Sequence, residues 1–130
     1  MLNALNEGGS LGGISFGDLG APDGNGSVRA AETTGILGSI TLPSGTRQSV
    51  FTGANIVINT NPQASFIAGY GSTALSSSNI VNRAITLIHE LGHAANIIYG
   101  AGSSKIQDDQ NDPTGKTSKD NSKLVKKNCF

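Results

Sequence analysis

The sequence predicts an α+β fold, with a small sheet packed on a buried central helix, in a single domain of 130 residues. Between Asn79 and Tyr99, apolar residues recur at helical spacing over about two-thirds of the circumference, which is typical of a buried helix. Short segments rich in β-branched residues precede this helix and are bounded by turn-forming residues, which indicates strands.

The strands are expected in the first half of the chain. Residues 36–43 read as a strand that ends at Pro43, and Pro43, Ser44 and Gly45 predict a turn. A second extended region follows, and Gly53 divides it into 48–52 and 54–59. Ile56, Val57 and Ile58 make the later part the stronger strand prediction.

The beginning of the chain is richer in glycine than the rest. The chain has 18 glycines, and 12 of them lie before position 54. Hydrophobic residues make up 36% of the chain and charged residues 14%, so the hydrophobic core is expected to be small. Residues 1–35 are therefore expected to be glycine-rich and mostly loop, with one short helix at the start.

The C-terminal segment is polar and mildly basic. In the last thirty residues, six Lys against four Asp give a charge of +2, which indicates a solvated surface. A short helix is expected from about 118 to 128, capped by Ser118 or Asp120, with Leu124 and Val125 as its buried contacts.

Charge and cysteine content exclude several classes of protein. Nine basic and nine acidic residues give a net charge of zero, and no basic stripe is interleaved with aromatic residues, so nucleic acid is not expected as a partner. No segment reaches the roughly 18 apolar residues of a membrane span. Cys129 is the only cysteine, so the fold does not depend on an internal disulfide. The first residues do not resemble a signal peptide, and we expect a domain from a longer chain.

A metal-binding motif lies in the middle of the predicted helix. His89 and His93 are four residues apart, so both imidazoles lie on one helix face and can reach one Zn²⁺ ion. Glu90 follows the first histidine and projects in a neighbouring direction, where it can take a proton from water as a general base. These are the only two histidines of the chain, and Gly92 between them leaves room for close approach of another backbone. The alternative is an ordinary core helix with two partly buried histidines.

His89-Glu90-Leu91-Gly92-His93, in a helix preceded by a strand, resembles the zincin metallopeptidases. The resemblance covers about 45 residues, from Asn55 to Tyr99, and implies zinc-dependent hydrolysis of peptide bonds in a peptide or protein substrate. In that family an edge strand before the active helix binds extended substrate by strand addition. Residues 54–59 are the candidate for this strand.

The third zinc ligand is not set by a family motif. Where one zincin branch has a Gly and then a His or Asp, this chain has Asn96 and Tyr99, and Asn96 is a candidate for supporting the ligands. A second branch uses a downstream Glu, and no Glu follows Glu90; the Gly-Thr-x-x-Asp pattern of a third branch is also absent. Asp109 is the preferred ligand and Asp108 the next. The other candidates are Asp112, which suits a turn, Asp120, which suits a helix cap, and Cys129.

The stretch from Ile85 through Ile106 to Phe130 also resembles C-terminal domains of bacterial Rhs/YD-repeat proteins. That resemblance implies a toxin or effector module, secreted or delivered as part of a larger protein. Two alternatives to a peptidase stay open. One is an inactive zincin-like module that binds a partner, and the other is a structural zinc site completed by Asp109 and Cys129.

Overall fold

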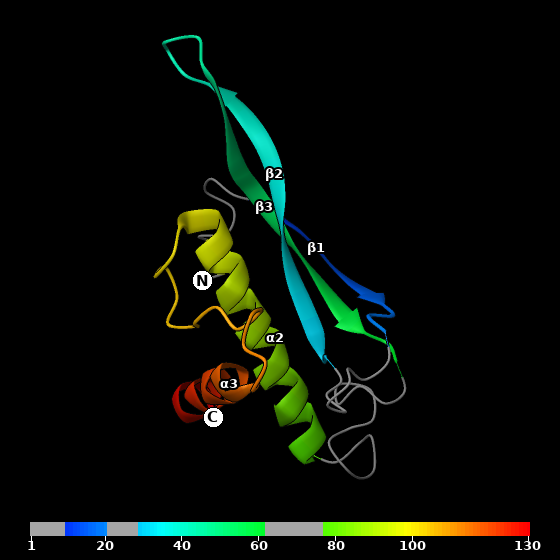
Figure 1. Ribbon diagram of the computed structural model, residues 1–130. Coiled ribbons are helices and arrows are strands. Elements are labelled where there is room, and N and C mark those ends of the chain that lie inside the picture. Colours follow the sequence, from blue (N-terminus) through cyan, green and yellow to red (C-terminus); the bar gives the residue numbers. More distant parts are fainter. Residues whose placement is uncertain (1–9, 21–28, 62–76) are drawn as a thin grey trace.

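The structure is a computed structural model, and it describes residues 10–20, 29–61 and 77–130. The described residues form a three-stranded mixed sheet and two helices, so the predicted α+β class is confirmed (Figure 1). In chain order the elements are β1 (Ser10–Gly17), β2 (Ala31–Thr41), β3 (Arg47–Asn59), α2 (Ser77–Tyr99) and α3 (Lys116–Cys129). Neither described helix is long and apolar enough to cross a membrane.

The sheet has the order β1-β3-β2, with β1 parallel and β2 antiparallel to β3. The predicted turn at 43–45 joins β2 to β3, where Gly45 has a φ of 82° and its N–H donates to the Leu42 carbonyl over 2.8 Å. The expectation that Gly53 separates two strands is wrong. β3 runs through Gly53, and the register shift between Ile36 and Leu37 absorbs the irregularity as a bulge.

The glycine-rich beginning of the chain holds a strand that the composition hides. β1 lies within residues 1–35, which were expected to be mostly loop, and β2 also begins there. A Cβ atom at Gly12 would collide with side-chain atoms of Asn55 on β3 and Ile36 on β2, so glycine here permits close contact with these side chains. The short helix expected at the start falls in residues 1–9, outside the described residues.

The expected role of residues 54–59 as an edge strand is also wrong. They belong to β3, which is the central strand and is paired on both sides. The free edge nearest the histidines belongs to β2, because Thr33 on β2 contacts Glu90. The sequence pattern could not distinguish these strands, since a central strand and an edge strand buried on one face alternate in the same way.

The helix α2 packs with one side against the sheet and with the other against the C-terminal segment (Figure 1). On the sheet side, Ala94 packs with a buried cluster from β2 and β3: Ala31, Ala54, Ile56 and Ile58. On the other side, Ile85 packs with Ile106 and with Val125 of α3. The expectation of a buried central helix is therefore confirmed, and so is the burial of Val125.

The helix α3 begins earlier than expected and is capped differently. It starts at Lys116, and Gly115 at the N-cap position has a φ of 63° with no side-chain cap. The Asp112 carboxylate instead accepts the backbone N–H of Thr117 over 2.7 Å, from outside the helix. Asp120 lies inside α3 and pairs with lysines, so the expectation that Asp120 or Ser118 caps the helix is wrong.

The glycine inside the motif is in close contact with residues 104–106, as the sequence suggested, but the nearest atoms belong to side chains. A Cβ atom at Gly92 would lie 2.8 Å from Ile106 Cβ and closer still to Ile106 Cγ1. The Ser104 hydroxyl donates to the Gly92 carbonyl over 2.9 Å. Any side chain at position 92 would push this segment away from α2.

Replacing Gly92 with Ala should destabilise the fold by about 1–3 kcal/mol, because overpacking against Ile106 outweighs the better helix propensity of alanine. Urea unfolding followed by circular dichroism measures the change. Gly13→Ala is the matched control, since a Cβ atom at Gly13 would meet nothing within 4 Å. Equal stability of Gly92→Ala and Gly13→Ala would contradict the steric argument.

Candidate metal centre

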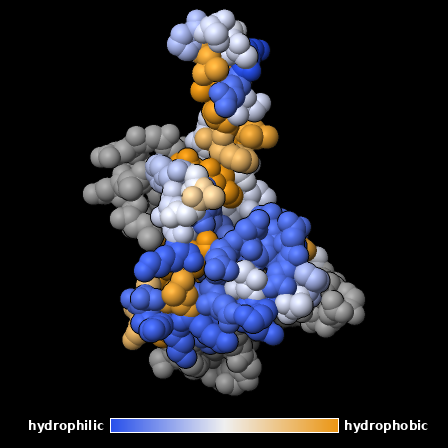
Figure 2. All heavy atoms as spheres, turned by 60° about the vertical axis from the view of Figure 1, so that its left-hand side comes forward, coloured by the Kyte–Doolittle hydropathy of each residue, from blue (hydrophilic) through white to orange (hydrophobic). Residues whose placement is uncertain are grey.

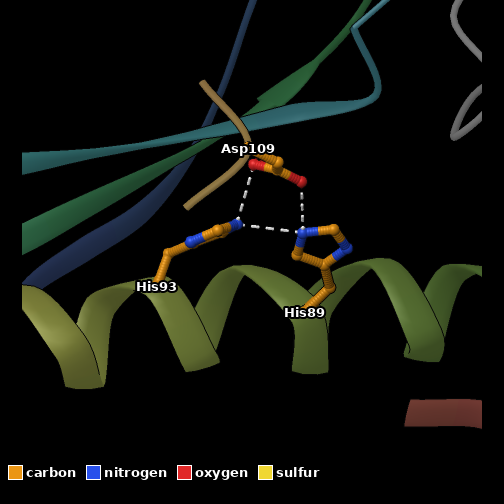
Figure 3. Close-up of side chains that lie close together, drawn as sticks. All are labelled: His89, His93 and Asp109. Carbon is orange, nitrogen blue, oxygen red and sulfur yellow. Dashed lines mark hydrogen bonds and ion pairs between the residues drawn. The ribbon is translucent and has the colours of Figure 1, made fainter. Parts of the chain in front are cut away.

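His89 and His93 lie one turn apart on α2 and point to the same side of the helix (Figure 3). Their Nε2 atoms are 2.9 Å apart, and the ring centroids are 4.9 Å apart. Both side chains are well covered, with 6% of His89 and 13% of His93 exposed. The helical spacing thus brings two metal-binding nitrogens to one point.

Asp109 comes to the same point from the segment between the two helices (Figure 3). Its Oδ2 atom lies 3.0 Å from His89 Nε2, and its Oδ1 atom lies 3.1 Å from His93 Nε2. Each of the three residues offers one ligand atom, and these atoms all lie within 4.8 Å of one another. The structure therefore brings together the three residues that the sequence analysis selected as metal ligands.

The electrostatics of the cluster favour an ionised carboxylate. Burial raises the pKa of Asp109, but hydrogen bonds from His89 and His93 outweigh this effect and hold the pKa well below its usual range. Burial lowers the pKa of His93, and the hydrogen bond and charge of Asp109 more than compensate, so that the net shift is upward. Asp109 is thus an anion next to two imidazoles, which is the donor set of a cation site.

The chemistry of the three donor groups suits a zinc ion. In a tetrahedral site with bonds of about 2.0–2.2 Å, ligand atoms would lie roughly 3.3–3.6 Å apart. The two Nε2 atoms are 2.9 Å apart, and they lie 3.0 and 3.1 Å from different oxygens of the Asp109 carboxylate, so small side-chain adjustments would admit an ion. Two nitrogens and one carboxylate oxygen also match the donor types that catalytic zinc uses, with one position left for water.

The other candidate ligands have different contacts. Asp108 is exposed, and its Oδ1 atom accepts the backbone N–H of Gln110 over 3.1 Å. Asp112 accepts the backbone N–H groups of Thr114 and Thr117, which is the turn role expected for it. Asp120 pairs with Lys116 and Lys123, and Cys129 is exposed at the end of α3. Among the described residues, none of the four joins the histidine cluster.

The segment that carries Asp109 is held by two asparagines. Asn96 on α2 donates to the Ile106 carbonyl and accepts the Ser104 N–H, each over 2.7 Å. Asn121 on α3 is only 3% exposed, and its amide bonds both the N–H and the carbonyl of Gln107, over 3.0 and 2.8 Å. Asn96, a candidate supporting residue from the sequence, thus acts on the loop that holds Asp109.

Two further contacts support the motif, and neither is expected from the sequence. Ser122 on α3 places its hydroxyl 3.3 Å from His89 Nδ1, the nitrogen that faces away from Asp109. Thr33 on β2 donates a hydrogen bond of 2.6 Å to Glu90 Oε2. Ser122 is 33 residues from His89 in the sequence, and Thr33 is 57 residues from Glu90. No local sequence pattern links residues so far apart, so only the fold reveals these contacts.

These groups line an open cleft of about 1120 Å³. The beginning of β2, the middle of α2, the segment 109–115 and α3 form its walls, and His89, Glu90, His93 and Asp109 all lie on its surface. A cleft of this size can accommodate a stretch of extended polypeptide next to the metal-binding cluster.

A comparison with protein-family models places the chain in a family. The model of Peptidase_M91, described as an effector protein, matches residues 1–127. The chain belongs to the Peptidase_M91 family of effector proteins. No curated protein and no solved structure matches the chain. Membership in this family indicates a peptidase effector that acts on protein and is delivered or secreted.

Replacing Asp109 with Asn should lower the affinity for zinc by more than about 100-fold, since even groups that only orient metal ligands typically contribute 10–100-fold. Competition with a chromogenic chelator at fixed pH measures the affinity. Asp108→Asn is the matched control, because it makes the same change one residue earlier on an exposed side chain. If both variants bind zinc as the parent does, Asp109 is not a ligand.

Proposed function

We propose that this protein is a zinc-dependent peptidase in which His89, His93 and Asp109 hold the ion and Glu90 is the general base. The observation that carries the proposal is the convergence of two imidazoles and one carboxylate at the surface of a cleft. Membership of Peptidase_M91 supports peptide-bond hydrolysis as the reaction.

A zinc ion held by these residues would lower the pKa of a water molecule towards neutrality and would polarise the carbonyl group under attack. Glu90 lies next to the first histidine and is only 8% exposed. Its carboxylate accepts the proton of the attacking water and returns it to the amine that leaves when the peptide bond breaks. The low exposure of Glu90 limits competition from bulk water for this proton.

The free edge of β2 is the surface on which we place extended substrate. The Asn59 N–H donates to the Ala30 carbonyl, so Ala30 faces β3, and alternation turns the backbone groups of Ala31 and Thr33 to the free edge. The Thr33 carbonyl already accepts a hydrogen bond of 3.1 Å from the Gln110 side chain at this edge. An extended peptide would pair with the other backbone groups of this edge, those of Ala31 and the Thr33 N–H, with its scissile bond near the cluster.

The two alternatives have less support. A structural zinc site needs four protein ligands, but the described residues offer a group of three, and Cys129 is exposed outside it. An inactive binding module would not need a buried carboxylate beside the histidines, and Glu90 occupies that position. The effector family agrees with delivery as the mode of action, and we retain the bacterial Rhs-type origin as a hypothesis.

Glu90→Gln should reduce kcat at least about 100-fold, because the amide cannot accept the proton of water, while zinc content stays at one ion per chain. Zinc content by elemental mass spectrometry and turnover of a quenched fluorescent peptide library measure the two effects. His89→Ala is the companion variant and should lose both zinc and activity. Retained turnover in Glu90→Gln would remove Glu90 from the mechanism, and a parent chain without zinc would remove the whole proposal.

A further inference from the structure

The side chain of Thr33 is the contact between the sheet and the carboxylate of Glu90. Thr33 is 2% exposed, and its Oγ1 atom lies 2.6 Å from Glu90 Oε2 and 3.2 Å from the Glu90 backbone carbonyl oxygen. A threonine hydroxyl has a single proton to donate. The shorter distance, typical of a hydroxyl bound to a carboxylate, assigns that proton to Oε2.

This hydrogen bond gives the two carboxylate oxygens of Glu90 different roles. Oε2 is bound to Thr33, and no other described side chain is hydrogen-bonded to the carboxylate. Oε1 therefore remains as the oxygen that can accept a proton. A free glutamate side chain would sample several rotamers, so the bond to Thr33 restricts where Oε1 lies.

We propose that Thr33 is the positioning residue of the general base. It lies on β2, the strand that we assign to the substrate, and its own carbonyl faces the free edge. One residue thus links the position of the substrate backbone to the position of the base. This role rests on the proposed peptidase function, because only a catalytic Glu90 requires it.

Thr33→Val removes the hydroxyl and preserves the shape of the side chain. We expect kcat to fall about 100-fold, the loss that misplacement of a catalytic group by about 1 Å produces, with KM and zinc affinity little changed. Thr33→Ser keeps the hydroxyl and should restore most of the activity. Thr34→Val, the same change at the exposed neighbouring position, is the matched control and should behave as the parent.

Crystal structures of the parent and of Thr33→Val test the same role without an assay of turnover. The Glu90 carboxylate should leave its parental position in the variant, and an unmoved carboxylate or an undiminished kcat would overturn the proposal. Thr33→Ala also removes the hydroxyl and does not place a methyl group against the Glu90 carboxylate, so it replaces Thr33→Val if that variant does not fold. A parent chain without zinc-dependent activity would defeat the proposed function, whereas the position of Glu90 would still decide whether Thr33 holds it.

A separate observation concerns the charge on the wall of the cleft formed by α3. Lys119, Lys123 and Lys126 line the cleft, and their spacing places them on one face of the helix. Lys123 pairs with Asp120 over 3.2 Å, but within the described part of the chain Lys119 and Lys126 have no carboxylate partner. Figure 2 shows a largely hydrophilic surface over the helical part of the molecule.

Each acidic side chain of the cleft already has a hydrogen-bond or ion-pair partner within the protein. Glu32 pairs with Arg29 over 2.8 Å, Asp112 bonds backbone N–H groups, and Asp109 and Glu90 have their own partners in the metal centre. Asp112 and Glu90 keep their negative charges, but the α3 wall presents Lys119 and Lys126 without a carboxylate partner among the described residues, so the charge that this wall offers a ligand is positive. We infer that the preferred substrate is a polypeptide segment with Asp or Glu side chains that face α3, a preference that also rests on the proposed function.

Fluorescent peptides with Glu or with Gln at each position test this preference by binding to the Glu90→Gln variant, so turnover is not required. The acidic peptides should bind about tenfold more tightly at low salt, and the double change Lys119→Glu and Lys126→Glu should reverse the preference. Lys105→Glu with Lys127→Glu gives the same change in net charge outside the cleft and should leave it intact.

Equal binding of the Glu and Gln peptides, or an equal loss of preference in both double variants, would overturn the inference. A result of this kind leaves the peptidase proposal standing if the parent still hydrolyses peptides in a zinc-dependent way. Conversely, a parent without zinc or turnover that still selects acidic peptides would defeat the peptidase proposal alone.

Discussion

The structure depends on the burial of two opposite sides of α2. One side meets the sheet through Ala94, and the other meets Ile106 and α3 through Ile85. His89 and Glu90 are 5% and 8% exposed on this helix, so the polar groups of the motif lie between two apolar contacts. Burying polar groups costs free energy unless each has a partner, and this requirement explains why hydroxyls and a carboxylate converge on the motif.

The carboxylate of Asp109 depends on backbone anchoring rather than on a helix or strand of its own. Asn96 from α2 and Asn121 from α3 bond backbone groups of residues 104–107, immediately before Asp109. Gln110, immediately after it, donates to the Thr33 carbonyl of β2. The segment is thus tied to the sheet and to both helices, which preorganises the ligand and reduces the entropy lost when an ion binds.

The sequence predicts features that depend on residues close together in the chain, and it does not predict contacts between residues far apart in the chain. The helix, the spacing of His89 and His93 and the turn at Gly45 are local patterns, and each lies where it was expected. β1 was missed because glycine obscures strand propensity, and the order of the strands depends on pairing between distant segments. Thr33 and Ser122 reach the motif from 57 and 33 residues away, so no local pattern could identify them.

The helix α3 supports the candidate metal centre although it supplies none of the three proposed ligands. Ser122 contacts His89 Nδ1, which leaves Nε2 to face Asp109, and Asn121 holds the backbone before Asp109. Val125 on the same helix completes the apolar cluster with Ile85 and Ile106. Orientation of one ligand, placement of another and burial of the second core therefore all require α3 to be docked. Because these contacts share one element, a metal ion bound at the candidate centre and the docking of α3 would stabilise each other.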